Sequence, residues 1–268
     1  MIFDGVRPSG HWIANFSFVS SIDFFTFVTE ARQGVNFYNL ELNHRFYQKP
    51  KEEQVKIQIL IALGAIFIIA MAFLLSVISG FFLLVLFVFP ITLSIIAPFF
   101  DTPSLKKSGR LIYFSSLFIV EKEKNGVIKV HGGTLFDYVF VIDRNMSGKQ
   151  RTSFIIQQYL EGLINLLEEY ENNESQNIRV KGTTYIINKR TAHKIGFQVV
   201  KTDFIQNIIL VYNYFNLLFS NSIARARLSF PNISNVITIE GNLGDLIANK
   251  ERLISLNERI KKSLGHSR

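Results

Sequence analysis

The sequence predicts an α+β membrane protein in which a two-helix transmembrane hairpin is joined to a cytoplasmic domain of β-hairpins and amphipathic helices. Three observations lead to this fold class: a long apolar segment without charges, short β-branched runs after it, and amphipathic helical patterns between and beyond those runs. Because paired strands and separate helices dominate over strict strand–helix alternation, the pattern is typical of α+β architecture.

The apolar segment extends from Ile57 to Phe100 and contains no Asp, Glu, Lys, Arg or His. The hydrocarbon core of a bilayer is about 30 Å thick and takes roughly 20 helical residues to cross, so the segment is about twice one crossing. The small pair Ser79-Gly80 divides it into predicted crossings at 57–78 and 81–100. Because no charge lies within these crossings, the sequence does not favour a transport pathway through one protomer.

Basic residues flank both ends of the predicted hairpin, and its turn has none. By the positive-inside rule, we expect both termini and the soluble domain on the cytoplasmic side of the inner or plasma membrane. Basic groups this close to the headgroups each contribute on the order of 1 kcal/mol of attraction to anionic lipid. The predicted headgroup contacts are Lys49, Lys51, Lys56, Lys106, Lys107 and Arg110.

Residues 1–56 form a predicted N-terminal segment with one helix and one strand. An apolar helical pattern covers 22–33 and ends at Gly34. Two interpretations remain open for this helix: packing onto the cytoplasmic domain, or lying at the headgroup level as an interfacial helix. Apolar and polar residues alternate through 38–46, which predicts a half-buried strand.

Residues 101–268 are the predicted cytoplasmic domain. In its first half, Asn125-Gly126 is the strongest short hairpin signal, and the apolar residues after Gly148 recur with helical spacing. The second half again has a strand pair before a helix, so two related hairpin-plus-helix units are a hypothesis that the sequence leaves open. The predicted strands are 111–120, 127–130, 135–142, 178–187, 195–200 and 236–240, and the predicted helices are 152–171, 204–226 (capped by Asp203) and 243–264.

The composition narrows the chemistry. Cysteine is absent, which excludes disulfides, thiolate nucleophiles and cysteine-ligated metal sites. The net charge of +8 indicates an anionic partner, first of all the headgroups of the bilayer and then a nucleotide, whereas nothing in the sequence favours nucleic acid. The sequence predicts no metal site and leaves any cofactor undetermined.

No P-loop, dinucleotide fingerprint, zinc-protease motif or nucleophile elbow is present. The best local candidate for anion binding is His131-Gly132-Gly133-Thr134, because two glycines after a strand let backbone N–H groups converge on a ligand. An ordinary glycine turn explains the same pattern. Asp137 and Asp143 lie on one face of the strand predicted there, and with His131 they are weak candidates for acid–base catalysis.

A second candidate for anion binding is the basic turn predicted between the strands 178–187 and 195–200. Its cationic and titratable side chains can surround a phosphate, although an exposed hairpin turn accounts for them equally. The residues concerned are Lys189, Arg190, His193 and Lys194.

These observations favour a scaffold, accessory or regulatory subunit that is anchored in the membrane and faces the cytoplasm. We expect it to act in an oligomeric assembly, either as a homo-oligomer or as one subunit of a membrane complex. One alternative is a ligand-gated membrane effector, whose basic domain senses an anionic signal such as a nucleotide and whose hairpins oligomerise to disturb the bilayer. Another is an enzyme acting on a lipid or lipid-linked substrate. The absence of a catalytic motif makes the enzyme the weaker hypothesis.

Overall fold

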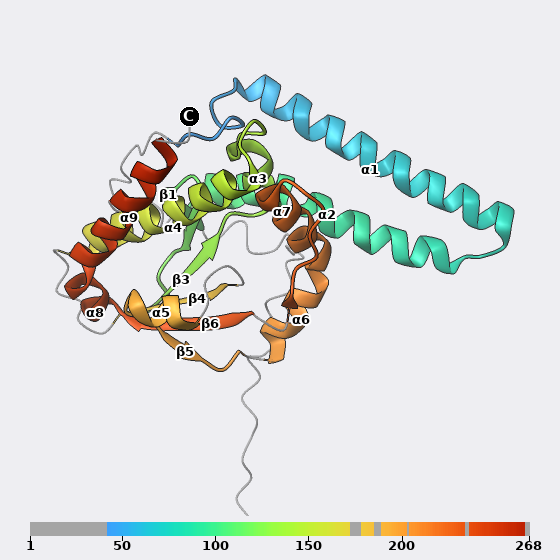
Figure 1. Cartoon of the computed structure of the whole chain (residues 1–268). Coiled ribbons are helices and arrows are strands. Elements are labelled where there is room, and N and C mark those ends of the chain that lie inside the picture. The colour runs from blue at the N-terminus through green and yellow to red at the C-terminus, as the bar shows by residue number, and fades with distance from the viewer. Residues whose placement is uncertain (1–41, 172–177, 185–188, 203, 234–235, 266–268) are drawn as a thin grey trace, which may run out of the picture. The chain divides into compact units, whose positions relative to one another are not determined.

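The computed structural model describes residues 42–171, 178–184, 189–202, 204–233 and 236–265. This part of the chain is a mixed α+β protein with helices packed around one sheet, as the sequence predicts (Figure 1). Two of its helices are long and apolar enough to cross a membrane. The predicted helix at 22–33, most of the predicted strand at 38–46, and Asp203 lie outside the described residues.

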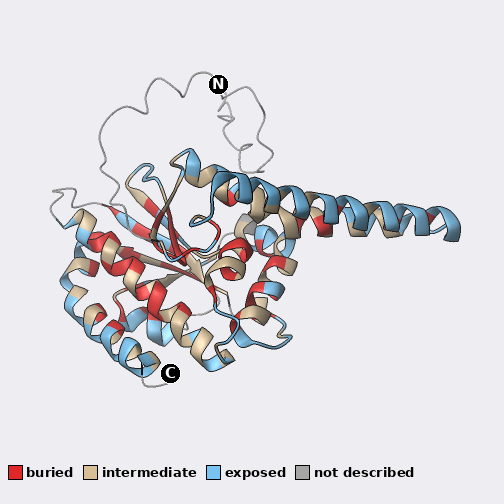
Figure 2. Cartoon of the chain, turned by 90° about the horizontal axis from the view of Figure 1, so that it is seen from above, coloured by how far each residue is buried: buried red, intermediate tan, exposed pale blue. Residues whose placement is uncertain are grey.

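The two long helices, α1 (Lys51–Ser79) and α2 (Leu83–Lys107), run side by side as an antiparallel pair, the α1–α2 hairpin. Gly80 ends α1 with a φ of 70°, a conformation that glycine adopts without strain. In their most apolar windows, only 17% and 11% of the residues are buried, so the hairpin exposes most of its apolar surface (Figure 2). This exposure is compatible with lipid contact and differs from that of a core helix in a soluble domain.

The described strands form one six-stranded sheet in the order β1-β2-β3-β4-β6-β5. Neighbouring strands are antiparallel except β3 and β4, which are parallel and are connected through the helix α4 (Gly148–Tyr170). The strands are β1 (Leu111–Ser115), β2 (Phe118–Glu121), β3 (Val127–Gly132), β4 (Arg179–Thr184), β5 (Gln198–Val200) and β6 (Ile237–Asn242).

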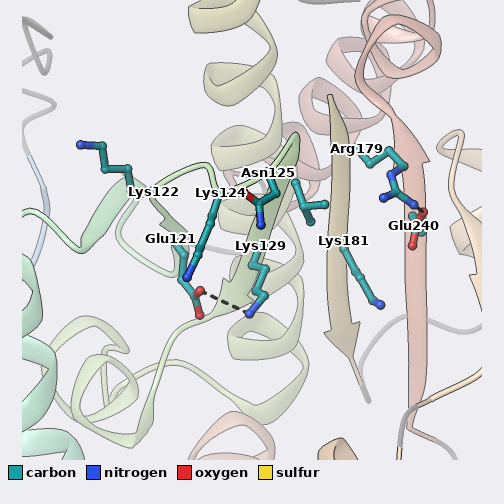
Figure 3. Close-up of a pocket in the computed structure, with 9 residues that line it drawn as sticks. Glu121, Lys122, Lys124, Asn125, Lys129, Arg179, Lys181 and Glu240 are labelled. Carbon is teal, nitrogen blue, oxygen red and sulfur yellow. Dashed lines mark hydrogen bonds and ion pairs between the residues drawn. The ribbon is translucent and has the colours of Figure 1, made fainter. Parts of the chain in front are cut away.

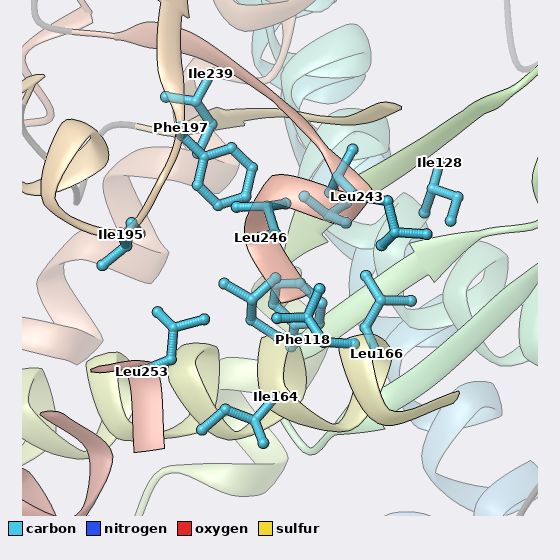
Figure 4. Packing of buried hydrophobic residues seen from close by; sticks show 14 of the residues in the cluster. Phe118, Ile128, Ile164, Leu166, Ile195, Phe197, Ile239, Leu243, Leu246 and Leu253 are labelled. Carbon is cyan, nitrogen blue, oxygen red and sulfur yellow. The ribbon is translucent and has the colours of Figure 1, made fainter. Parts of the chain in front are cut away.

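The hydrophobic core lies between one face of this sheet and the helices α4, α8 (Leu243–Ala248) and α9 (Lys250–Gly265) (Figure 4). Phe118 from β2, Leu166 from α4 and Leu246 from α8 all contribute to it. In β3, Ile128 and Val130 are buried, whereas Lys129 and His131 between and after them are exposed. Because alternate residues of a strand face opposite ways, the other face of the central strands is charged.

Two predictions for the first half of the domain are confirmed. Asn125 and Gly126 have positive φ values of 56° and 71° and join β2 to β3 as a tight turn. The helix predicted over 152–171 is α4, which begins four residues earlier because Ser147 and Gln150 form a capping box. The strand predicted over 111–120 is instead two antiparallel strands, since the chain turns back at Ser116.

The strand predicted over 135–142 is wrong, because Leu135–Val141 forms the helix α3. Thr134 and Asp137 make a capping box in which each side chain binds the other residue's backbone N–H. This cap starts a helix in a run of residues that favours a strand by propensity alone. Asp137 and Asp143 therefore do not share a strand face.

In the second half, the predicted hairpin 178–200 is also wrong. The segment predicted as its turn contains the short helix α5 (Lys189–Lys194), and β4 and β5 pair with β6 instead of with each other. The hypothesis of two related hairpin-plus-helix units fails with it. The strand at 236–240 is confirmed as β6.

Two predicted helices of the second half are each divided, at asparagines. The helix predicted over 204–226 consists of α6 (Phe204–Tyr212) and α7 (Tyr214–Arg225), separated at Asn213, and the last predicted helix breaks at Asn249. Asparagine competes with the helix for backbone hydrogen bonds, and the Nδ2 of each donates to a carbonyl four residues earlier. The described end of the strand predicted over 38–46, from Leu42 onward, is a loop and turn.

Candidate functional site

The charged face of the central strands, which we call the basic face, carries a shallow pocket of about 420 Å³ (Figure 3). Lys129 of β3 and Lys181 of β4 lie opposite each other in the parallel register, and both are exposed. Five cationic and two acidic side chains line the pocket, so an anion would be attracted to it. The lining residues are Glu121, Lys122, Lys124, Asn125, Val127, Lys129, Arg179, Lys181 and Glu240.

Two ion pairs orient side chains on the basic face. Arg179 Nη1 lies 2.9 Å from Glu240 Oε1, and Lys129 Nζ lies 3.7 Å from Glu121 Oε2. Glu121 also accepts a 2.7 Å hydrogen bond from His131, and this bond is the main reason that the pKa of Glu121 is lowered. Both acidic residues are therefore engaged, while Lys181 extends into the pocket with no described ion pair.

Asp137 is the centre of a buried polar cluster where α2, α3 and β1 meet. Its carboxylate is fully buried and accepts hydrogen bonds from Tyr113 Oη at 2.6 Å, Thr134 N at 2.6 Å and Thr134 Oγ1 at 2.8 Å. His44 Nε2 lies 3.3 Å from the same carboxylate. Thr102 of α2 contacts Thr134 through their hydroxyls at 3.3 Å, so the cluster includes α2.

Aromatic rings and a lysine close this Asp137 cluster. Burial, and then the charge of Asp137, raises the pKa of Tyr113, so its phenol stays a proton donor to the carboxylate. Lys106 Nζ lies 3.6 Å from the centroid of the Tyr47 ring, a cation–π geometry. The last turns of α2 are thus built into the domain by polar as well as apolar contacts.

The segment before α1 binds to the same region. Phe46 is buried against Phe136 and Phe140 of α3, with ring centroids 4.9 and 5.3 Å apart. The Arg45 guanidinium donates to the carbonyls of Val139, Phe140 and Ile142 at the C-terminal end of α3, and the Arg45 backbone N–H also donates to the Phe140 carbonyl at 3.3 Å. These contacts hold both ends of the α1–α2 hairpin on α3.

A larger and mainly apolar cavity of about 760 Å³ lies between the ends of β3 and β4 and the helices α2, α4, α6 and α7. Pro98 and Leu105 line it from α2, and Leu163 lines it from α4. Its size is within the range of small-molecule sites, about 300–1,000 Å³. The predicted segment His131–Thr134 forms part of its wall.

The three weak catalytic candidates have separate surroundings. Asp137 is enclosed in the buried cluster, His131 is exposed and paired with Glu121, and Asp143 accepts a hydrogen bond from Asn145 N in a polar turn. Nothing described here aligns the three on one reacting atom. Among the described residues, no group of three or more metal-ligating side chains could hold an ion.

The predicted anion loop is tightly packed. A side chain at Gly132 would meet Tyr159 Oη at 2.1 Å, and one at Gly133 would meet Leu117 at 2.8 Å, so close packing accounts for both glycines. The N–H of Thr134, which could have bound an anion, donates to Asp137. The role of this segment in binding stays a prediction.

The second predicted anion site lies on α5. Its four charged or titratable side chains, those of Lys189, Arg190, His193 and Lys194, are all exposed on this short helix. Among the predicted headgroup contacts, Lys107 and Arg110 are exposed, whereas the ammonium of Lys106 lies on the Tyr47 ring. The basic face was missed because its residues come from strands far apart in sequence, although period-two alternation in 127–132 and 179–183 was an available signal.

The fold and these sites define an α+β protein with two potential membrane-spanning helices, a basic sheet face and a mainly apolar, partly open cavity. No family model, curated protein sequence or solved structure matches the chain.

Proposed function

We propose that the protein is a regulatory or accessory subunit held in the membrane by the α1–α2 hairpin, with its domain and both termini in the cytoplasm. The observation that carries this proposal is the continuity of α2, which passes from an exposed apolar stretch into the Asp137 cluster without a break. A linker would allow the domain to move freely, whereas a continuous helix transmits its displacement to the hairpin.

Topology and assembly test this proposal together. The chain has no native cysteine, so Ser255→Cys on the exposed side of α9 gives a single thiol. A membrane-impermeant maleimide should label it in opened cells and leave it unlabelled in intact cells. Native mass spectrometry and cross-linking in mild detergent should show a discrete oligomer or a bound partner. A strictly monomeric protein with no partner, or labelling in intact cells, would contradict the proposal.

The basic face favours a second candidate, a ligand-gated effector that binds an anionic signal such as a nucleotide. Lys129 and Lys181 are the central cations of the face, because they lie opposite each other on adjacent strands. In this mechanism, an anion bridging β3 and β4 would alter the packing of the sheet on α2 and α3, and hence the hairpin.

Release of a dye from liposomes that contain the protein, as candidate nucleotides are added, tests the effector. We expect leakage with the cognate nucleotide and its loss in Lys129→Glu/Lys181→Glu. The double variant Arg252→Glu/Arg259→Glu, at two exposed positions of α9 outside both candidate anion sites, changes the net charge equally and should still leak. If no nucleotide binds or causes leakage, or if both double variants behave alike, this candidate is refuted.

A further inference from the structure

The helix α6 exposes an apolar surface that no described element covers. The side chains of Ile208, Val211 and Tyr212 are 50%, 65% and 58% exposed, and Phe219 of α7 is 42% exposed. The sequence contains no Asp, Glu, Lys, Arg or His from Phe204 to Ala224. An exposed apolar patch within so long an uncharged stretch is typical of a surface that meets lipid or another protein.

Hydrogen bonds to α2 fix the level of α6 along the hairpin. Gln58 Nε2 of α1 donates to the Phe99 carbonyl of α2 at 2.9 Å, which places the two ends of the apolar segment at one height. Ser94 lies five residues before Phe99 on α2, a rise of about 8 Å toward the tip of the hairpin. Ser94 Oγ donates to the Tyr212 carbonyl at 3.1 Å, so the end of α6 lies at this level.

The length of the hairpin sets where the bilayer must begin. A hydrocarbon core of about 30 Å requires roughly 20 residues of α1, which counted back from Ser79 reach Leu60, within one turn of Gln58. The boundary of the core therefore falls close to Gln58 and Phe99. The junction of α6 and α7, level with Ser94, lies several ångströms inside it.

Side-chain groups bind several backbone carbonyls at this junction. Asn213 Nδ2 donates to the Ile209 carbonyl at 3.0 Å, and Asn216 Nδ2 donates to the Ser94 carbonyl at 2.7 Å. The Ile209 carbonyl also accepts from Asn213 N at 2.9 Å, and Ser94 Oγ donates to the carbonyl of Tyr212, the last residue of α6. An interruption at membrane depth is tolerated where the protein itself supplies such partners.

We propose that α6 and the α6–α7 junction form a third membrane-contacting element, which lies in the interface of the leaflet from which α2 emerges. Nine residues span about 14 Å, too short to cross the core, and α6 runs at an angle to α2 instead of continuing along it (Figure 1). In this arrangement the exposed Ile208 and Val211 face the acyl chains, while Gln206 and Leu210 line the apolar cavity. The inference rests on the proposed insertion of α1 and α2.

Three single-cysteine variants of the full chain, labelled with a polarity-sensitive bimane, test this proposal in phosphatidylcholine vesicles. Val211→Cys reports on α6, Phe89→Cys reports on the middle of the hairpin, and Ser255→Cys reports on the far surface of the domain; the wild-type residues are all exposed. Nitroxides at carbon 5 or carbon 12 of the lipid chain quench shallow or deep labels, respectively. Because each position is exposed, the label should not disturb folding.

For Val211→Cys we expect a blue-shifted emission and greater loss of intensity with the shallow quencher than with the deep one. Phe89→Cys should show the opposite order, and Ser255→Cys should be quenched by neither. If Phe89→Cys is quenched while Val211→Cys behaves like Ser255→Cys, the inference about α6 is wrong and the hairpin anchor stands. If Phe89→Cys is also unquenched, the proposed membrane insertion fails and the inference fails with it.

Discussion

Replacement of Asp137 by alanine is the sharpest test of how the domain is joined to α2. The substitution removes the acceptor of Tyr113 Oη and of Thr134 N and Oγ1, and it leaves His44 Nε2 without its carboxylate. Loss of the cap costs about 0.5–2 kcal/mol, and a buried donor left unsatisfied costs about 1–3 kcal/mol. We therefore expect a loss of about 3–5 kcal/mol in the free energy of unfolding, because the substitution removes the cap and leaves more than one buried donor without an acceptor.

Thermal unfolding of the purified chain in mild detergent, followed by circular dichroism at one scan rate, measures this effect. For a domain of this size, about 3–5 kcal/mol corresponds to a Tm lowered by roughly 6–20 °C. Asp143→Ala is the matched control, because Asp143 accepts one exposed hydrogen bond from Asn145 N and should change the Tm little. Equal Tm values for the two variants would refute the central role of Asp137.

Asp137→Asn separates the charge of the side chain from its shape. One amide oxygen can still accept from Thr134 N, and the amide nitrogen can donate toward Tyr113 Oη, so a smaller loss than for alanine is expected. If the asparagine variant is as unstable as the alanine variant, the negative charge contributes more than the hydrogen-bond geometry. That outcome would indicate an ionic centre at this junction.

Two further predictions concern packing and pH. Gly162→Ala should destabilise the protein by about 1–3 kcal/mol, because the new Cβ would lie 2.3 Å from Phe118 Cβ. Gly64→Ala has open space at its Cβ and should change the stability by less than about 1 kcal/mol. Similar melting curves for the two variants would contradict this prediction. The pKa of Glu121 is lowered in the folded protein, so its stabilising effect is present above the ordinary value of about 4.3 and is lost as the pH falls through the folded value. Glu121→Gln should therefore lower the stability by less than about 1 kcal/mol at neutral pH, since the pair is partly exposed, and the difference from wild type in urea titrations should shrink, not grow, on acidification.

The sequence by itself determined the elements whose signals are local. The uncharged segment 57–100 predicts the two long helices and their turn, because their length and lack of charge are properties of one stretch of chain. The tight turn at Asn125-Gly126 and the amphipathic pattern of α4 follow in the same way from residues close together in sequence.

Only the tertiary structure decided the features that depend on distant residues. Apolar β-branched runs favour strands by propensity, yet Leu135–Val141 becomes a helix because Asp137, which completes the capping box with the N-cap residue Thr134, is held by Tyr113 and lies beside His44. Lys129 and Lys181 form one basic face because β3 and β4 are parallel neighbours, a pairing that neither strand specifies alone. Likewise, α6 contains no charge that could mark its place, and the contacts of its C-terminal end with Ser94, far away in the sequence, put that end beside the hairpin.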